Sequence, residues 1–166
     1  MKDMTDDQLI HRNLSGNIEL EEAINLVIPL AQRTLRIFDF NLENGGYNSP
    51  ARFEMLKNFL LASRANRIDI ALHNTDYLSR YCPRMLCLLE QFSHAIHIHQ
   101  TNDEAKSAHD SFIIVDHAHY IHRFHYDAPR ALMALHDPAG ALAMSHRFDE
   151  IWAKTTPSIF ATTLGL

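Results

Sequence analysis

The sequence has little of what marks a secreted, redox-active or membrane-spanning protein. Its 166 residues include only two cysteines, Cys82 and Cys87, and their spacing fits neither a redox pair nor a zinc site. No apolar run approaches the roughly 18–20 residues that cross a bilayer. The polar start MKDMTDDQLIHRNLSG lacks the basic and apolar regions of a signal peptide. We therefore expect buried structural thiols, no membrane span and a cytoplasmic location.

Positive charge is also in deficit, because 15 lysines and arginines face 20 acidic residues and give a formal net charge of −5. Broad attraction to nucleic acid or to an anionic membrane needs basic patches. We expect no membrane partner, and nucleic acid is a lesser alternative to a protein partner. The 12 histidines could reverse the sign of the net charge as the pH falls through about 6.5.

Strand and helix patterns alternate along most of the chain. Residues 1–16 form a flexible leader in this reading, and residues 17–166 form one α/β domain. Helices are predicted from residue 17 to a kink or end near Pro29, from Ser49 and Pro50 through residue 66, and over 83–94 and 138–154. Strands are predicted over 35–40, 67–72, 95–100, 111–116 and 119–126. The hairpin near residue 116 makes the sheet mixed, with helices flanking it.

The stretch HDSFIIVD, residues 109–116, places a histidine and an aspartate at the two ends of an apolar strand. Phospholipase D-like proteins carry the pattern His-x-Lys-x-x-x-x-Asp at this spacing. Their closing helix begins with Asp-Pro and ends in an aromatic, acid and tryptophan cluster, which HDPAGALAMSHRFDEIW resembles. The resemblance to this superfamily covers about residues 19–155. It implies a mixed β-sheet flanked by helices, built as a single phospholipase D-like repeat.

The resemblance also assigns roles, and this sequence departs from two of them. In the superfamily the histidine attacks phosphorus, the lysine and a later asparagine hold phosphate oxygens, and the aspartate orients the imidazole. His109 and Asp116 match, but Ser111 stands at the lysine position and Tyr126 at the asparagine position. Losing a preorganised charged donor typically costs several powers of ten in rate. Chains with one motif complete their site by pairing two subunits, so the resemblance implies a homodimer through the face bearing His109.

The register of the hairpin decides what surrounds His109, and the sequence leaves two registers open. A turn near His117 places Phe124 and Tyr126 on the face of His109 and Ser111, where the two rings would fill the phosphate position. A slip of one residue turns Arg123 and His125 toward His109 instead. Arg123 would then bind phosphate in place of the lysine, with Lys106 as a weaker candidate.

Three functions follow from these residues. The predicted one is a non-catalytic domain with a binding or assembly role, in which His109 and Asp116 are motif remnants and Arg123 and Tyr126 contact a ligand, with no cofactor and no metal. The alternative is a divergent phosphodiesterase or nuclease that uses His109 as nucleophile, Asp116 as its orienting partner and Arg123 as phosphate binder. A metal-binding module is the third, and it requires three or four histidines of one set to converge: His94, His97, His99, His117, His119 and His122.

Overall fold

An eight-stranded mixed β-sheet organises the computed structural model, which describes residues 8–160. The strand order is β1-β7-β6-β5-β2-β3-β4-β8, and only β2, β3 and β4 run parallel to one another. The strands are β1 (Ile10–Ser15), β2 (Thr34–Asp39), β3 (Arg67–Leu72), β4 (Ile96–Thr101), β5 (Ser111–Val115), β6 (His119–Arg123), β7 (Arg130–Leu135) and β8 (Thr155–Ile159). The predicted mixed α/β sheet is confirmed.

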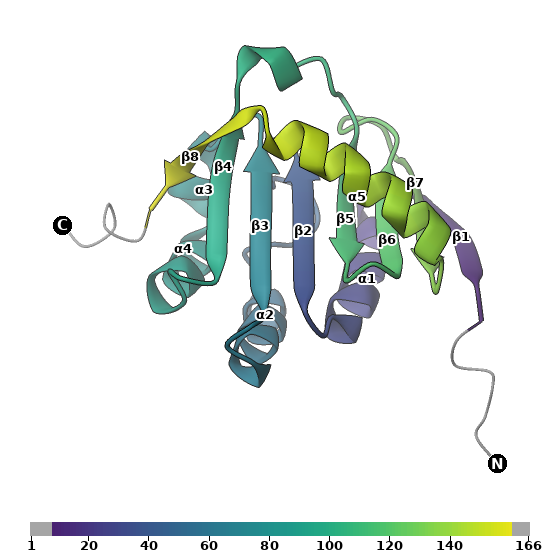
Figure 1. Ribbon diagram of the computed structural model, residues 1–166, viewed down its shortest axis with the longest axis horizontal. Helices are drawn as coiled ribbons and strands as arrows, with labels where there is room; N and C mark the ends of the chain where they lie inside the picture. The colour runs from purple at the N-terminus through teal and green to yellow at the C-terminus, as the bar shows by residue number, and fades with distance from the viewer. Residues whose placement is uncertain (1–7, 161–166) are drawn as a thin grey trace.

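Helices cover both faces of this sheet unequally (Figure 1). The α-helices are α1 (Gly16–Val27), α2 (Pro50–Ala62), α3 (Asp76–Tyr81), α4 (Pro83–Gln91) and α5 (Pro138–Trp152), with short 3-10 helices η1 (Ile28–Leu30) and η2 (Asp103–Ala105). Helix α5 crosses one face alone, and α1 to α4 pack on the other. Among residues 8–160, no helix is long and apolar enough to span a membrane.

Local sequence explains where two of the helices begin and end. Ser49 caps α2, since its hydroxyl accepts a hydrogen bond from the Arg52 backbone N–H at 3.1 Å, and Pro50 occupies the first helical position. Helix α1 ends at Val27, and Pro29 lies in the 3-10 turn that follows. Proline cannot continue the regular hydrogen bonding of an α-helix. Both sequence predictions are confirmed.

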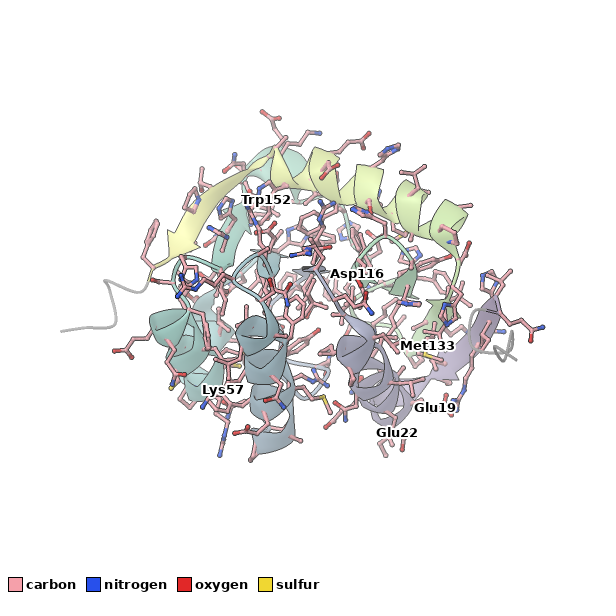
Figure 2. The ribbon with its side chains drawn as sticks, turned by 60° about the horizontal axis from the view of Figure 1, so that its bottom comes forward. Glu19, Glu22, Lys57, Asp116, Met133 and Trp152 are labelled. Carbon is pink, nitrogen blue, oxygen red and sulfur yellow. The ribbon has the colours of Figure 1, made fainter. Side chains whose placement is uncertain are left out.

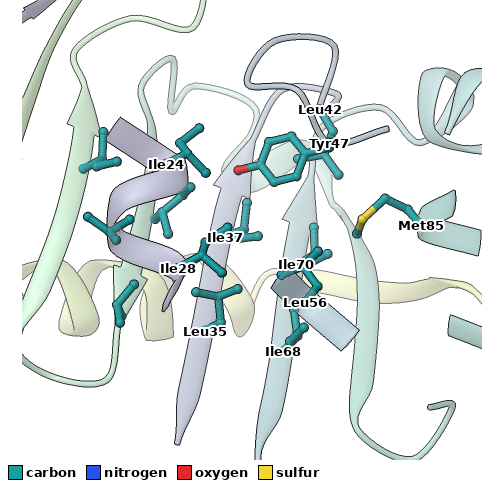
Figure 3. Packing of buried hydrophobic residues seen from close by; sticks show 14 of the residues in the cluster. Ile24, Ile28, Leu35, Ile37, Leu42, Tyr47, Leu56, Ile68, Ile70 and Met85 are labelled. Atoms are coloured by element: carbon teal, nitrogen blue, oxygen red, sulfur yellow. The ribbon is translucent and has the colours of Figure 1, made fainter. Parts of the chain in front are cut away.

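The larger core lies between the sheet and helices α1 to α4. Aliphatic side chains of α1, α2, β2 and β3 meet there around the fully buried Ile37 (Figure 3). Alternation along β5 sends Ile113 toward this core and Phe112 and Ile114 toward α5. Whether a residue holds an odd or an even position on β5 therefore decides whether its side chain packs in the larger core or against α5.

Three strands were missing from the sequence prediction. Residues 10–15, assigned to a flexible leader, form β1 and pair antiparallel with β7; residues 1–7 lie outside the described part. Strand β7 is built from RALMAL, residues that favour helix intrinsically, and it extends because β1 and β6 pair with it on both sides. Strand β8 is a short edge strand that contains Pro157, which removes one ladder donor.

Candidate functional site

The carboxyl ends of β2, β3 and β4 meet the start of β5 at one edge of the sheet, the upper edge in Figure 1. Beside β2 the sheet changes direction, because β3 runs parallel to it and β5 antiparallel. Open α/β sheets bind ligands at such a switch point, outside the carboxyl ends of the strands. Two cavities open here, one around Ser111 and one around His109.

The β5–β6 hairpin combines parts of both predicted registers. Ser111 pairs directly with Arg123, so these two side chains share a face of the sheet. The prediction that Phe124 shares this face is wrong, and its side chain is 53% exposed. Two residues before Ser111, the register has moved by one: the Tyr126 backbone N–H donates to the His109 carbonyl at 2.7 Å. Arg123 is therefore opposite the lysine position, while Tyr126 is opposite His109.

Ser111 and Arg123 line a small cavity of about 30 Å³, to which Asp39 and Asn44 add polar groups among mostly apolar side chains. Asp39 accepts a hydrogen bond from the Leu42 backbone N–H at 3.0 Å and one from the Ser111 hydroxyl. Arg123 is only 7% exposed, and its Nε donates to the Ala128 carbonyl at 2.6 Å. A volume of this size holds one or two waters. The space at the lysine position is thus too small for a phosphodiester.

Burial dominates the electrostatics of this cavity. Removal from water raises the pKa of Asp39 from 3.8 to about 6, although the backbone N–H groups of Phe40 and Leu42, the charge of Arg123 and the Ser111 hydroxyl all oppose the rise. Asp39 keeps some exposed surface as a residue, but its carboxylate is enclosed by these groups. A carboxylate and a guanidinium occupy the volume that a substrate phosphate and its lysine would need.

His109 lines a separate cavity of about 350 Å³, together with Phe40, His73, Asn74, Lys106 and Tyr126. The two cavities share no lining residue. The Tyr126 ring stacks on Phe40 with centroids 4.6 Å apart and lies 6.3 Å from the His109 ring, which is exposed. His109 and Arg123 are both near the site, but they do not converge on one reacting position.

A buried histidine fixes the loop that carries His109. His73 Nε2 lies 2.6 Å from the Ala108 carbonyl, and its Nδ1 lies 2.6 Å from the Thr101 hydroxyl. Burial lowers the pKa of His73, which favours the neutral ring that donates to Ala108 and accepts from Thr101. Lys106 Nζ in turn donates to the His73 carbonyl at 2.6 Å. Lys106, the weaker candidate for phosphate binding, is therefore engaged with the backbone.

Asp116 lies at the opposite end of β5, at the lower sheet edge of Figure 1 that Figure 2 brings forward. Seven residues of extended chain separate it from His109 by about 23 Å. Its carboxylate accepts hydrogen bonds from the backbone N–H groups of Gln32, Arg33 and Thr34 at 2.8–3.3 Å. The role of orienting partner for His109 is therefore wrong for Asp116, and the structural reading of this aspartate fits its contacts.

Sequence reasoning missed Asp110, which forms a charged cluster with His122 and Arg147 near the site. Its carboxylate contacts His122 Nε2 at 2.8 Å and binds Arg147 of α5 through two nitrogens. Burial alone would raise the pKa of Asp110, but hydrogen bonds and charge from His122 and Arg147 lower it to about 2. Alternation of side chains along the strand was the available signal. Because Ser111 faces α1, its neighbours Asp110 and Phe112 must face α5.

The six histidines proposed for metal binding do not converge. His99 stacks on Trp152 at 3.8 Å between centroids, His97 lies 3.3 Å from Asp69, and His119 accepts a hydrogen bond from a backbone N–H. Within residues 8–160, no group of three or more histidine, cysteine or acidic residues could hold a metal ion. The arrangement that the metal-binding hypothesis requires is therefore not found in the described part of the chain.

Several solved structures share the fold. Nuc from Salmonella typhimurium, a phospholipase D family member, has a TM-score of 0.64 at 12% identity, with 91% of this chain and 99% of that chain covered. TrmBL2, an archaeal chromatin protein, has a TM-score of 0.66 at 11% identity, with coverage of 95% and 57%. Phosphatidylserine synthase from Haemophilus influenzae has a TM-score of 0.58 at 16% identity, with coverage of 98% and 42%. The predicted phospholipase D-like fold is confirmed.

Sequence comparison places the chain in a family. The model described as "Domain of unknown function (DUF7931)" matches residues 17–160, and the chain belongs to that family. No curated protein matches the sequence.

Proposed function

We propose that this member of the family is a non-catalytic phospholipase D-like domain that works by binding at the carboxyl ends of its parallel strands. The observation that carries the proposal is the separation of His109 from Ser111 and Arg123 into two cavities. Phosphoryl transfer through a histidine needs the nucleophile and the phosphate-binding cation at one reacting position. Neither cavity supplies both.

The lining of the His109 cavity suits binding better than catalysis. Stacked Phe40 and Tyr126 rings form an aromatic wall, and Asn74 adds an exposed polar group. The volume of about 350 Å³ lies within the range of small-molecule sites. Asp116, which would orient a catalytic imidazole in the superfamily, binds backbone at the far end of the strand instead.

A divergent phosphodiesterase is the second candidate, and one observation favours it. The direct pairing of Ser111 with Arg123 puts a cation on the face where the superfamily lysine stands. For catalysis the guanidinium would have to leave the Ala128 carbonyl and reach His109. The first candidate requires no such rearrangement, so it is preferred.

Turnover of bis(p-nitrophenyl) phosphate and of single-stranded DNA from pH 5 to 8 tests the choice. We expect wild type, His109→Ala and the control His94→Ala to be equal at background, His94 being an exposed histidine before β4. Activity that His109→Ala abolishes and His94→Ala retains would overturn the non-catalytic proposal. Loss of that activity in Arg123→Met would then identify the phosphate binder, since methionine keeps much of the side-chain volume and removes the cation.

The homodimer expected from the resemblance stays a proposal. If the face bearing His109 is the interface, Tyr126→Glu would place a charge among the rings at that face and shift the protein to monomer. Sedimentation equilibrium of wild type and of this variant measures the change. A wild-type monomer at tens of micromolar would contradict the dimer.

A further inference from the structure

The His109 cavity has an apolar wall whose rings hold one another in place. The Tyr126 ring stacks with Phe40 at 4.6 Å between centroids and with His125 at 4.7 Å, and the interplanar angles are 14° and 24°. Phe40 and Tyr126 line the cavity and are only partly exposed. Because these rings are already packed, little further ordering is needed when a flat apolar ligand contacts them.

Lys106 adds a fixed positive charge to the same cavity. Its Nζ donates to the His73 carbonyl at 2.6 Å, and its side chain is only partly exposed. A free surface lysine loses side-chain entropy when it binds a ligand, whereas this ammonium is already held. An ammonium has three N–H groups, so Lys106 can donate to an anion while it keeps the bond to His73.

No acidic side chain lines this cavity within the described residues 8–160. Asp110, the acid next to His109 in the sequence, faces α5 and is bound there by Arg147. The exposed side chains of Asn74 and His109 add hydrogen-bonding groups to the lining. The cavity therefore suits an anion that carries an apolar body.

The single ammonium also selects the kind of anion. The free energy needed to remove an ion from water rises with the square of its charge, whereas its attraction to one cation rises only in proportion. A monoanion is therefore favoured over a dianion. A phosphodiester is a monoanion too, but its oxygens are far less basic than those of a carboxylate and accept weaker hydrogen bonds from one ammonium. Arg123 does not add its charge here, because it lines the separate cavity at Ser111.

We propose that the His109 cavity binds a small aromatic monocarboxylate. The ring of the ligand packs against Phe40 and Tyr126, and its carboxylate binds Lys106 and Asn74. This inference rests on the binding role proposed for the cavity, and it names the class of ligand.

Chemical-shift titration with benzoate, benzamide, acetate and methyl phenyl phosphate tests the proposal. Benzamide keeps the ring without the charge, acetate keeps the carboxylate without the ring, and methyl phenyl phosphate keeps the ring and a single negative charge. We expect benzoate to bind about tenfold or more tightly than each of the others, with shifts at the Asn74 and Tyr126 amides. Binding of any of the three as tight as that of benzoate, or no shift with benzoate at about 20 mM, would overturn the proposal.

Failure of this proposal differs from failure of the non-catalytic role. Benzoate has no bond that a phosphodiesterase cleaves, so its affinity can be measured whether or not His109 is catalytic. Phosphodiester turnover that requires His109 would overturn the non-catalytic role and leave the benzoate result unchanged. Absence of benzoate binding would overturn the ligand class and leave the turnover result unchanged.

A lysine variant tests the assigned carboxylate site. Lys106→Met keeps the apolar stem and removes the cation, so it should bind benzoate no more tightly than benzamide. The control Lys57→Met removes a cation from α2, outside the cavity, and should keep the preference for benzoate. A preference for benzoate that Lys106→Met retains would contradict the assignment.

A second variant keeps the test decisive if Lys106→Met fails to fold. Asn74→Asp changes an exposed side chain and keeps the oxygen that accepts a hydrogen bond from the Asp76 backbone N–H. The new charge should repel a carboxylate, so benzoate should bind about fivefold or more weakly while benzamide binds as before. The control Asn58→Asp adds the same charge to an exposed position of α2 and should change neither affinity. Unchanged benzoate affinity in Asn74→Asp would contradict the site.

Discussion

The carboxylate of Asp39 offers a direct test of the small cavity at Ser111, because burial there raises its pKa while the nearby hydrogen-bond donors and Arg123 lower it. A pKa of about 6 in the folded protein, against 3.8 for an unburied aspartate, means that the folded state holds this proton more tightly than the unfolded state. As the pH rises from 4 to 6, the unfolded chain ionises first, so the free energy of unfolding falls. Relative to a fully protonated Asp39, ionisation of this group lowers the free energy of unfolding by about 3 kcal/mol at pH 8 and by about 0.5 kcal/mol at pH 4.

Asp39→Asn removes this ionisation and keeps an oxygen that can accept from Leu42 or Ser111. We expect the stability of the variant relative to wild type to improve by about 2.5 kcal/mol between pH 4 and pH 8. The absolute difference at one pH also contains the lost charge beside Arg123, so the change with pH is the quantity to measure. Residual exposure of the side chain makes this value an upper bound.

Urea denaturation of wild type and Asp39→Asn, followed by circular dichroism at pH 4 and pH 8, gives the two free energies of unfolding. Asp103→Asn, which changes an exposed carboxylate in η2, is the matched control and should show no such pH-dependent gain. A constant difference between Asp39→Asn and wild type at both pH values would refute the argument that Asp39 is held in a low-dielectric cavity.

Three further changes test other contacts. Asp116→Ala should lower the free energy of unfolding by about 1–3 kcal/mol, since three backbone N–H groups lose their acceptor. Urea denaturation measures the change, and an unchanged midpoint would contradict it. Asp110→Asn should lower the free energy of unfolding at pH 7, but the difference from wild type should shrink as the pH falls from about 4 to 2. The reason is that the lowered pKa of Asp110 stabilises the folded state only above that range. Urea denaturation at a series of acidic pH values measures the difference. Gly140→Ala should destabilise because its Cβ would collide with the Tyr120 hydroxyl, and Tyr120→Phe in the same chain should recover part of the loss in thermal melts.

The fold was predictable where local pattern and tertiary pairing agree. RIDIAL forms β3 with the predicted bounds, and Ser49 caps α2 as predicted. Residues 130–135 failed this test because their intrinsic preference is helical and only the neighbouring strands override it. Edge strands β1 and β8 were missed for a related reason. Each is short and mostly polar and pairs with one neighbour only, so apolar and polar residues alternate weakly along it.

The candidate site was predictable as a location but not as a geometry. The motif spacing located His109 and Ser111 at the start of β5, whereas the alignment of the two hairpin strands could not be read from residue types. The strands hold one register at Ser111 and another at His109. Such an extra residue at the end of a ladder re-aims side chains without leaving a mark in hydrophobic periodicity.

This one-residue offset explains why restoring the lysine alone would not recreate a phosphoryl-transfer site. A lysine at position 111 would send its ammonium into a cavity of about 30 Å³ that Arg123 already occupies with the same charge. Like charges at such a distance in a buried site disfavour each other strongly. Asp39 could neutralise one of them, but it would then hold the lysine away from any substrate. Recovery of catalysis therefore requires moving Arg123 and Tyr126 as well, which means changing the register of β6 rather than one side chain.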